Sequence, residues 1–281
     1  MDPFEFTPAV DRLIDMALEE DIGPGDITTA HTIAADAAGR AVMVAKEDLV
    51  IAGLDVARRV FERLDSHVRF DAGYTDGDRI PRGRSVVELS GPLAALLTGE
   101  RTALNFLQRL SGIATHVHAC VAMLEGTGTQ LLDTRKTTPG WRALEKYAVR
   151  AGGGTNHRMG LYDAVLIKDN HIAGAGGITA AVRGVQSHVD PGMTIEVETT
   201  TLDEVREALE AGAHIIMLDN MSLDRIREAV QFVNGRAKLE VSGGITQEHL
   251  AALAATGVDY ISSGALTHSV RAVDLSMKIS G

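Results

Sequence analysis

Two segments, Asp133-Thr-Arg-Lys-Thr-Thr-Pro-Gly140 and, further along, Leu166-Ile-Lys-Asp-Asn-His171, decide how this chain can fold. In each segment, cationic side chains follow a short apolar run, residues 130–133 in the first and 164–167 in the second. Short apolar runs bounded by turn residues are typical of buried strands. Cations at the carboxyl ends of parallel strands can meet a ligand with several negative charges, such as a phosphate or a carboxylate. The pattern therefore indicates an enzyme with its site at the edge of a parallel sheet.

Between these segments, a triple-glycine turn precedes two further basic residues. The complete cationic cluster stands in an otherwise acidic chain and consists of Arg135, Lys136, His157, Arg158 and Lys168. His157 is a candidate general base, electrostatic partner or carboxylate ligand. Lys168 fits either a Schiff base, if desolvation lowers its pKa, or a simple anion-binding role. The number of neighbouring cations favours anion binding.

From residue 130 onward, apolar strand candidates alternate with helical stretches. The strand candidates end at Asp133, Ile167, Val197, Leu218, Val241 and Ile261, and helical stretches include residues 202–211, 223–233 and 247–256. This alternation predicts a parallel sheet, and the number of repeats favours a closed or nearly closed barrel. The sequence does not distinguish a complete eight-stranded barrel from a smaller one.

A polar, charged or glycine-containing motif follows every one of these strand candidates. In chain order the motifs are Arg135-Lys136, Lys168, Glu198, Asp219, Ser242-Gly243-Gly244 and Ser263-Gly264-Ala265. The last two are predicted to hold a phosphate, because glycines let backbone N–H groups approach it closely. Glu198 and Asp219 could hold ribose hydroxyls, a Mg²⁺ ion or both, and Mg²⁺ typically uses one or two carboxylates with substrate phosphates and waters.

The residues before this region form a separate, mixed unit. Strand-like pieces at 40–45, 50–52, 68–70 and 85–89 surround a helix at 55–64. A long helical pattern then runs from Leu93 to Leu124, with Gly112 as a candidate kink or break. We expect an N-terminal domain at residues 1–114, including this connecting helix, and a catalytic barrel domain at 115–281 whose last residues pack back on the first domain.

Composition limits the function further. The 281 residues carry a formal net charge of −11, which argues against nucleic acid as the main partner. The single cysteine, Cys120, suits a reducing compartment. No signal peptide and no membrane-spanning apolar run are found, so we expect a soluble, cytoplasmic protein. P-loop, dinucleotide-binding, His-Glu-x-x-His and Cys-x-x-Cys motifs are absent.

The chain resembles the quinolinate phosphoribosyltransferases of de novo NAD synthesis over nearly its whole length, from about residue 10. The matching segments are 100–115, 133–140, 146–149, 152–163, 166–171, 196–198, 218–220, 241–245 and 263–269. The resemblance implies an α/β fold in which an open α/β sandwich domain precedes an incomplete α/β barrel. It also implies homodimers or larger assemblies with shared active sites, in which Arg101 reaches the neighbouring subunit's site.

The resemblance assigns roles to the residues singled out above. Quinolinate would be surrounded by Arg135, His157, Arg158 and Lys168. The other substrate, phosphoribosyl pyrophosphate (PRPP), would be bound by Lys136, the two carboxylates and the turns 242–244 and 263–265, and Thr134 is a further expected substrate-binding residue. Glu198 and Asp219 would also hold the Mg²⁺ cofactor, directly or through water. The implied products are nicotinate mononucleotide, pyrophosphate and CO₂, and the implied catalytic residues are Lys136, Lys168, Glu198 and Asp219.

Three other readings of the sequence compete with this one. A related phosphoribosyltransferase-like protein of molybdate-transport operons shares the fold, but Asp133 and Lys168 in their motifs favour the quinolinate enzyme. A Schiff-base aldolase or lyase would use Lys168 covalently. An inactive metabolite sensor would bind quinolinate without turnover.

Overall fold

The computed structural model describes residues 4–280, whose contacts divide the chain into two units. The first unit runs to His118 and also includes Thr137–Gly153 and the described residues from Thr267 onward. The second unit comprises Ala119–Lys136 and Gly154–Leu266. The sequence predicts one domain boundary, after residue 114. The two units are defined by contacts in the structure, and Thr137–Gly153 and the described residues from Thr267 onward therefore group with the N-terminal residues.

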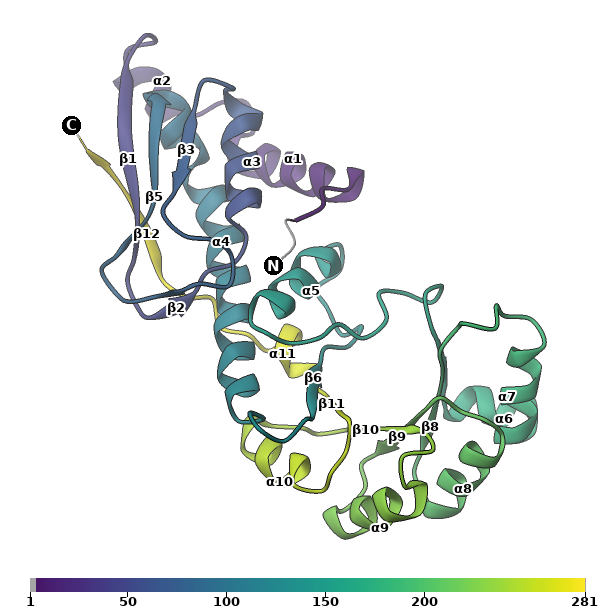
Figure 1. The fold of residues 1–281 in the computed structure, drawn as a ribbon. Helices are drawn as coiled ribbons and strands as arrows, with labels where there is room; N and C mark the ends of the chain where they lie inside the picture. The colour runs from purple at the N-terminus through teal and green to yellow at the C-terminus, as the bar shows by residue number, and fades with distance from the viewer. Residues whose placement is uncertain (1–3, 281) are drawn as a thin grey trace. The chain divides into compact units, whose positions relative to one another are not determined.

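The first unit is built around an antiparallel sheet (Figure 1). Among the described residues its strand order is β12-β1-β5-β3, and β2 pairs separately with β4. The last strand of the chain joins the sheet by pairing with β1 in the register Ala41↔Ile279. The elements of this unit are α1 (Pro8–Ile22), α2 (Ile27–Thr32), β1 (Ala38–Ala45), β2 (Leu49–Val50), α3 (Leu54–Leu64), β3 (Arg69–Ala72), β4 (Arg79–Ile80), β5 (Ser85–Pro92), the greater part of α4 (Leu93–Ala122), α5 (Arg142–Ala151) and β12 (Leu275–Ser280).

Helix α4 continues through Gly112 without a break. A Cβ atom at this position would lie 2.2 Å from the carbonyl oxygen of Arg271, so only glycine lets that backbone pass so closely. The glycine that the sequence marks as a candidate break is explained instead by a close approach between the helix and the segment leading to β12.

The second unit is a parallel sheet with helical crossovers (Figure 1). Within the described residues the strand order is β6-β11-β10-β9-β8-β7, and β6 and β7 form the two edges. The elements are β6 (Gln130–Leu132), β7 (Val165–Ile167), α6 (Asp169–Ala175), α7 (Ile178–Gln186), β8 (Ile195–Thr199), α8 (Leu202–Glu210), β9 (Ile215–Asp219), α9 (Leu223–Val233), β10 (Lys238–Ser242), η1 (Gln247–His249), α10 (Leu250–Ala254), β11 (Tyr260–Ser262) and α11 (Ala265–His268). The predicted α/β fold, an incomplete barrel preceded by an α/β sandwich, is confirmed.

Local sequence signals explain where the crossover helices begin and end. Thr201 and Glu204 form a reciprocal capping box at the start of α8. Ser222 caps α9 by accepting from the N–H of Arg225, and Asn234 ends that helix in the left-handed conformation, with φ of 46°. These caps fix where the two crossover helices begin and end, and the parallel pairing of the strands brings their carboxyl ends to one edge.

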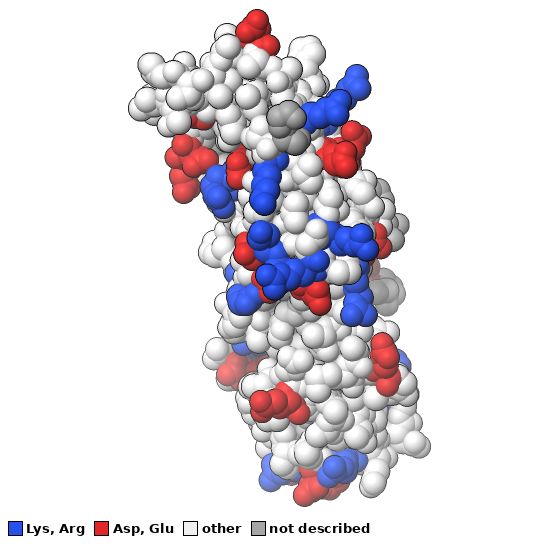
Figure 2. Space-filling model, turned by 90° about the vertical axis from the view of Figure 1, so that its left-hand side faces the viewer, with Lys and Arg blue, Asp and Glu red and all other residues white. Residues whose placement is uncertain are grey.

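No helix in residues 4–280 is long and apolar enough to cross a membrane. On the face drawn in Figure 2, Lys and Arg side chains are interspersed with Asp and Glu side chains and with uncharged surface.

Candidate active site

The carboxyl edge of the parallel sheet holds a pocket of about 460 Å³, which lies within the second unit. The lining residues predicted from the sequence are Thr134, Arg135, Lys136, His157, Arg158, Lys168, Glu198, Asp219, Ser242, Gly243 and Gly244. The lining also contains Leu166, Met217, Asn220, Glu240 and Ser262. The structure therefore brings together most of the predicted side chains around one cavity.

Buried Asp133 shapes the segment that carries His157 and Arg158. Its carboxylate is fully buried and accepts hydrogen bonds from the backbone N–H of His157, at 2.9 Å, and from Nδ2 of Asn156, at 2.5 Å. A carboxylate with two charge-assisted hydrogen bonds fixes this segment more strongly than a neutral acceptor can. The acid at the end of β6 thus holds two cationic side chains against the pocket.

The cationic side chains in the pocket are close enough to influence one another. Burial, followed by the positive charge of Arg135, lowers the pKa of Arg158 from its ordinary value. Arg158 donates from one terminal nitrogen to the carbonyl oxygen of Ala164 at 3.2 Å, whereas its Nε has no partner among the described residues. An anionic ligand between these arginines would reduce their repulsion and could accept a hydrogen bond from Nε of Arg158.

Carboxylates and a glycine turn lie beside these cations. Lys168 forms an ion pair with Glu198. Asp219 accepts from Nδ2 of Asn220 at 2.8 Å at the end of β9. After β10, Gly243 and Gly244 have φ values of +97° and +59°, and residues other than glycine rarely adopt this backbone conformation. A Cβ at Gly243 would also collide with the Asn220 side chain, so this turn requires glycine for two reasons.

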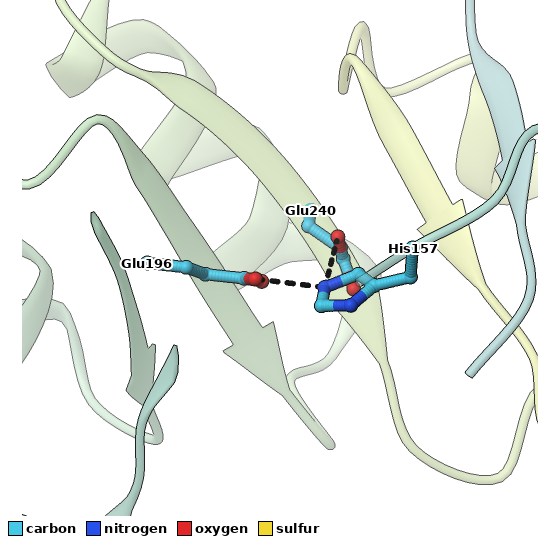
Figure 3. A group of neighbouring side chains, drawn as sticks. All are labelled: His157, Glu196 and Glu240. Carbon is cyan, nitrogen blue, oxygen red and sulfur yellow. Dashed lines mark hydrogen bonds and ion pairs between the residues drawn. The ribbon is translucent and has the colours of Figure 1, made fainter. Parts of the chain in front are cut away.

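Three ionisable side chains meet on the inner side of the barrel (Figure 3). Nε2 of His157 lies 2.8 Å from Oε2 of Glu196 and 3.7 Å from Oε2 of Glu240. Glu196 and Glu240 are buried, on β8 and β10, and His157 is largely buried. Burial and then the charge of Glu196 raise the pKa of Glu240 to about 8.

The remaining predicted residues do not line the pocket. Arg101 is exposed on α4, in the first unit. Ser263 is buried, its N–H donates to the carbonyl of Leu132 at 3.0 Å, and its Oγ donates to the carbonyl of Ile245 at 3.3 Å. Gly264 and Ala265 follow it and are also outside the lining. The phosphate-binding role of residues 263–265 stays a prediction.

Comparison with known proteins gives consistent matches over the whole chain. Residues 113–278 match the family described as "Quinolinate phosphoribosyl transferase, C-terminal domain", and residues 26–111 match its N-terminal domain. A probable nicotinate-nucleotide pyrophosphorylase (carboxylating) of Bacillus subtilis is 47% identical over 95% of this chain and 92% of its own length. Quinolinate phosphoribosyltransferase (decarboxylating) 1b of Nicotiana tabacum is 42% identical over 95% of this chain and 81% of its own.

A solved structure gives the same result. The nicotinate-nucleotide pyrophosphorylase of Francisella tularensis superposes with a TM-score of 0.94, at 44% identity and with full coverage of both chains. The chain belongs to the quinolinate phosphoribosyltransferase family.

Two acids of this quinolinate phosphoribosyltransferase site, Glu196 and Glu240, were not predicted from the sequence. Side chains two residues apart on a strand point to the same face. Glu196 therefore shares a face with Glu198, and Glu240 shares one with Ser242. This spacing was visible in the sequence, but a search for the first polar residue after each apolar run passes over charges within the run.

Proposed function

We propose that this chain transfers the phosphoribosyl group of PRPP to quinolinate with loss of CO₂, as the family's activity in NAD synthesis implies. The products are nicotinate mononucleotide, pyrophosphate and CO₂. The observation that carries the proposal is the pocket itself, where Arg135, Arg158 and Lys168 surround one cavity at the carboxyl edge of a parallel sheet. Such a concentration of cations suits two polyanionic substrates.

Quinolinate is assigned to the part of the pocket formed by Arg135, His157, Arg158 and Lys168. Its two carboxylates would lie where the guanidinium groups of Arg135 and Arg158 repel each other, which is the most favourable position for an anion. Lys168 serves as an electrostatic anchor, because it forms an ion pair with Glu198 and the reaction needs no imine.

PRPP is assigned to the other part of the pocket. Lys136 and Thr134 would contact its phosphates, and the backbone N–H of Lys136 already donates to Oγ1 of Thr134 at 3.0 Å. The open space at Gly244 suits close approach of the 5′-phosphate. Ser263, Gly264 and Ala265 are proposed to complete this phosphate site.

Glu198 and Asp219 would hold the ribose hydroxyls and Mg²⁺. The residues present fit the ion, because both carboxylates line the pocket beside the expected pyrophosphate, and Mg²⁺ prefers oxygen ligands of this kind. When bound, Mg²⁺ neutralises the charge that develops on the departing pyrophosphate.

The chemistry needs positioning rather than an activated nucleophile. The pyridine nitrogen of quinolinate attacks the anomeric carbon of PRPP while the bond to pyrophosphate breaks, through an oxocarbenium-like state. Lys136 stabilises the charge on the leaving group. The C–C bond to the 2-carboxylate then breaks and CO₂ leaves, the electron pair stays on C2 where the adjacent pyridinium nitrogen stabilises it, and a proton from solvent adds to C2 to give nicotinate mononucleotide. Holding two anions side by side is the protein's main task, and it accounts for so many cations in an acidic chain.

We further propose a homodimer or larger assembly in which the partner's Arg101 completes each site. The exposure of Arg101 on α4, in the first unit, makes it accessible to a second copy of the chain. A cytoplasmic location also remains a prediction from the sequence.

The direct test measures CO₂ released from carboxyl-labelled quinolinate, together with nicotinate mononucleotide by mass spectrometry. Release should require both PRPP and Mg²⁺ and should match the nucleotide in amount. Quinolinate binding without release of CO₂ would indicate a sensor, and CO₂ release independent of PRPP would indicate a different enzyme.

A further inference from the structure

The buried triad of His157, Glu196 and Glu240 has more negative charge than its surroundings can support. The candidate ligand atoms of the three side chains lie within 4.8 Å of one another. Figure 3 shows Nε2 of His157 facing both carboxyl groups. With both acids ionised and the histidine protonated, the triad would keep one net negative charge in the interior of the barrel, which is strongly unfavourable.

Hydrogen bonding shows the same deficit. Oε1 of Glu196 and both carboxyl oxygens of Glu240 lack a hydrogen bond of good geometry among the described residues, although the Ser262 hydroxyl and Glu196 lie close to Glu240. Two ionised carboxylates can only accept hydrogen bonds, so they cannot satisfy each other. A single proton changes this, because a neutral carboxyl group donates through its O–H to a neighbouring carboxylate.

The surroundings of Glu240 place that proton on Glu240. Glu196 faces it from β8, and His157 from the segment after the triple glycine, while β11 contributes the Ser262 hydroxyl and, opposite in register, Tyr260. Met217 of β9, its other neighbour in register, brings no charge. Burial and the charge of Glu196 outweigh His157 and Ser262 and raise the pKa of Glu240 from 4.5 to about 8.

We propose that Glu240 is a positioning residue for quinolinate, which as a neutral acid donates to Glu196 and so holds the Glu196 carboxylate against Nε2 of His157. His157 is thereby kept as the imidazolium and the triad becomes neutral overall, so the positive ring of His157 can face a substrate carboxylate without a net charge in the interior. This inference rests on the proposed assignment of quinolinate to the pocket.

The first measurement concerns stability and needs no substrate. Because its folded-state pKa is raised, Glu240 contributes stability below about pH 4.5 that is lost as the pH rises through about 8. Urea unfolding from pH 5 to 9 should therefore show a midpoint that falls with pH in the wild type and falls less in Glu240→Gln. Glu228→Gln, at an exposed position of α9, is the matched control and should keep the wild-type slope. An unchanged slope in Glu240→Gln would overturn the neutral-acid assignment.

The second measurement is quinolinate affinity by calorimetry without PRPP. Glutamine keeps a donor towards Glu196, so Glu240→Gln should bind within about twofold of wild type at pH 7, whereas Glu240→Leu should bind roughly tenfold or more weakly. Affinity should decline above about pH 8 in the wild type and decline less in Glu240→Gln. If the glutamine variant bound as weakly as the leucine variant, an ionised Glu240 would be required and the proposal would be wrong.

Two further outcomes separate this inference from its alternatives. If the wild type failed to bind quinolinate, the proposed function would fall, while the unfolding slopes would still decide the state of Glu240. A stoichiometric transition metal in the purified protein, detected by elemental analysis and lost in Glu240→Gln, would identify the triad as a metal site and overturn the positioning role. A ¹⁵N spectrum of His157 in which both ring nitrogens are protonated at pH 7 would support it.

Discussion

Two acids of the first unit and two of the second differ in how completely they are hydrogen-bonded. In the first unit, fully buried Glu145 accepts hydrogen bonds from the N–H and Oγ1 of Thr138, at 3.1 and 2.8 Å, and from Arg109, at 2.9 Å. Asp76 of the same unit accepts from the backbone N–H groups of Gly53 and Leu54 and from the Tyr147 hydroxyl. Every one of these donors comes from the unit itself, so both acids act as structural crosslinks.

In the second unit, Asp133 is likewise fully hydrogen-bonded, but other buried charges are left incomplete. Glu196, Glu240 and Arg158 each keep a buried polar atom without a partner among residues 4–280, and His157, Glu240 and Arg158 all line the pocket. Buried groups without partners cost stability, and they persist where a ligand or a proton completes them. Among these acids, complete hydrogen bonding marks the structural ones, and missing hydrogen bonds mark the ones beside the pocket.

Removing an arginine from the pocket should have the largest effect on activity. Arg135→Ala or Arg158→Ala should lower kcat/KM by roughly a hundred- to a thousand-fold, because each loses charge-assisted contacts with a quinolinate carboxylate. Stability should change little in Arg158→Ala, since the change removes a repulsion with Arg135 together with a hydrogen bond to the carbonyl of Ala164. Calorimetry with quinolinate and thermal unfolding measure the two effects.

The control for these variants is Arg183→Ala, which truncates an exposed arginine on α7 of the same unit. It should leave both affinity and stability at wild-type values. Unchanged quinolinate affinity in Arg135→Ala and Arg158→Ala would remove these arginines from the substrate site.

The next test asks whether the incomplete pocket is completed by a second copy of the chain. Arg101→Ala and Lys168→Ala should each be inactive alone. After subunit exchange in an equal mixture, a mixed dimer contains one site with both groups. Because about half of the dimers are mixed, activity should recover to about a quarter of the wild-type value.

Subunit exchange must be shown independently, for example by mass spectrometry of differently tagged chains. Exchange without any recovery of activity would mean that Arg101 acts within its own chain, and the shared-site proposal would be wrong.

Much of the second unit follows from local sequence. Lys168, Glu198 and Asp219 lie at strand ends that the alternation of apolar runs and helices predicts, and parallel strands bring such ends to one edge. The contact of Glu240 with Glu196 and His157 could not be obtained this way, because it depends on which strand lies next to which. That choice is made by the packing of the whole sheet.

The first unit was harder to predict because its contacts are distant in sequence. The pairing of β12 with β1 joins the two ends of the chain, and no local pattern indicates the register Ala41↔Ile279. Gly112 illustrates the same difficulty. A glycine inside a helical pattern suggests a break, and only the path of the backbone at Arg271 shows that it is needed for close packing.

The smallest expected effect lies in the first unit, where Tyr147→Phe removes one donor from Asp76. The hydroxyl donates to Oδ2 of Asp76 at 2.6 Å, so its loss should lower the free energy of unfolding at pH 7 by about 1.5–3 kcal/mol. Quinolinate affinity should not change, because both residues belong to the first unit and the pocket belongs to the second. Tyr74→Phe is the matched control, since it removes the hydroxyl of another half-buried residue in the first unit.

The loss of unfolding free energy in Tyr147→Phe should depend on pH. Burial raises the pKa of Asp76 above 3.8, and the hydrogen bond from Tyr147 opposes that shift. For a raised pKa, stability is lost as the pH rises from 3.8 through the folded-state value. Without the tyrosine hydroxyl the pKa of Asp76 rises further, so the loss extends over a wider range. The difference in unfolding free energy between Tyr147→Phe and the wild type should therefore be larger at pH 7 than at pH 4. A difference that is equal at both values would mean that Asp76 does not ionise in this range, and that its crosslink is a neutral one.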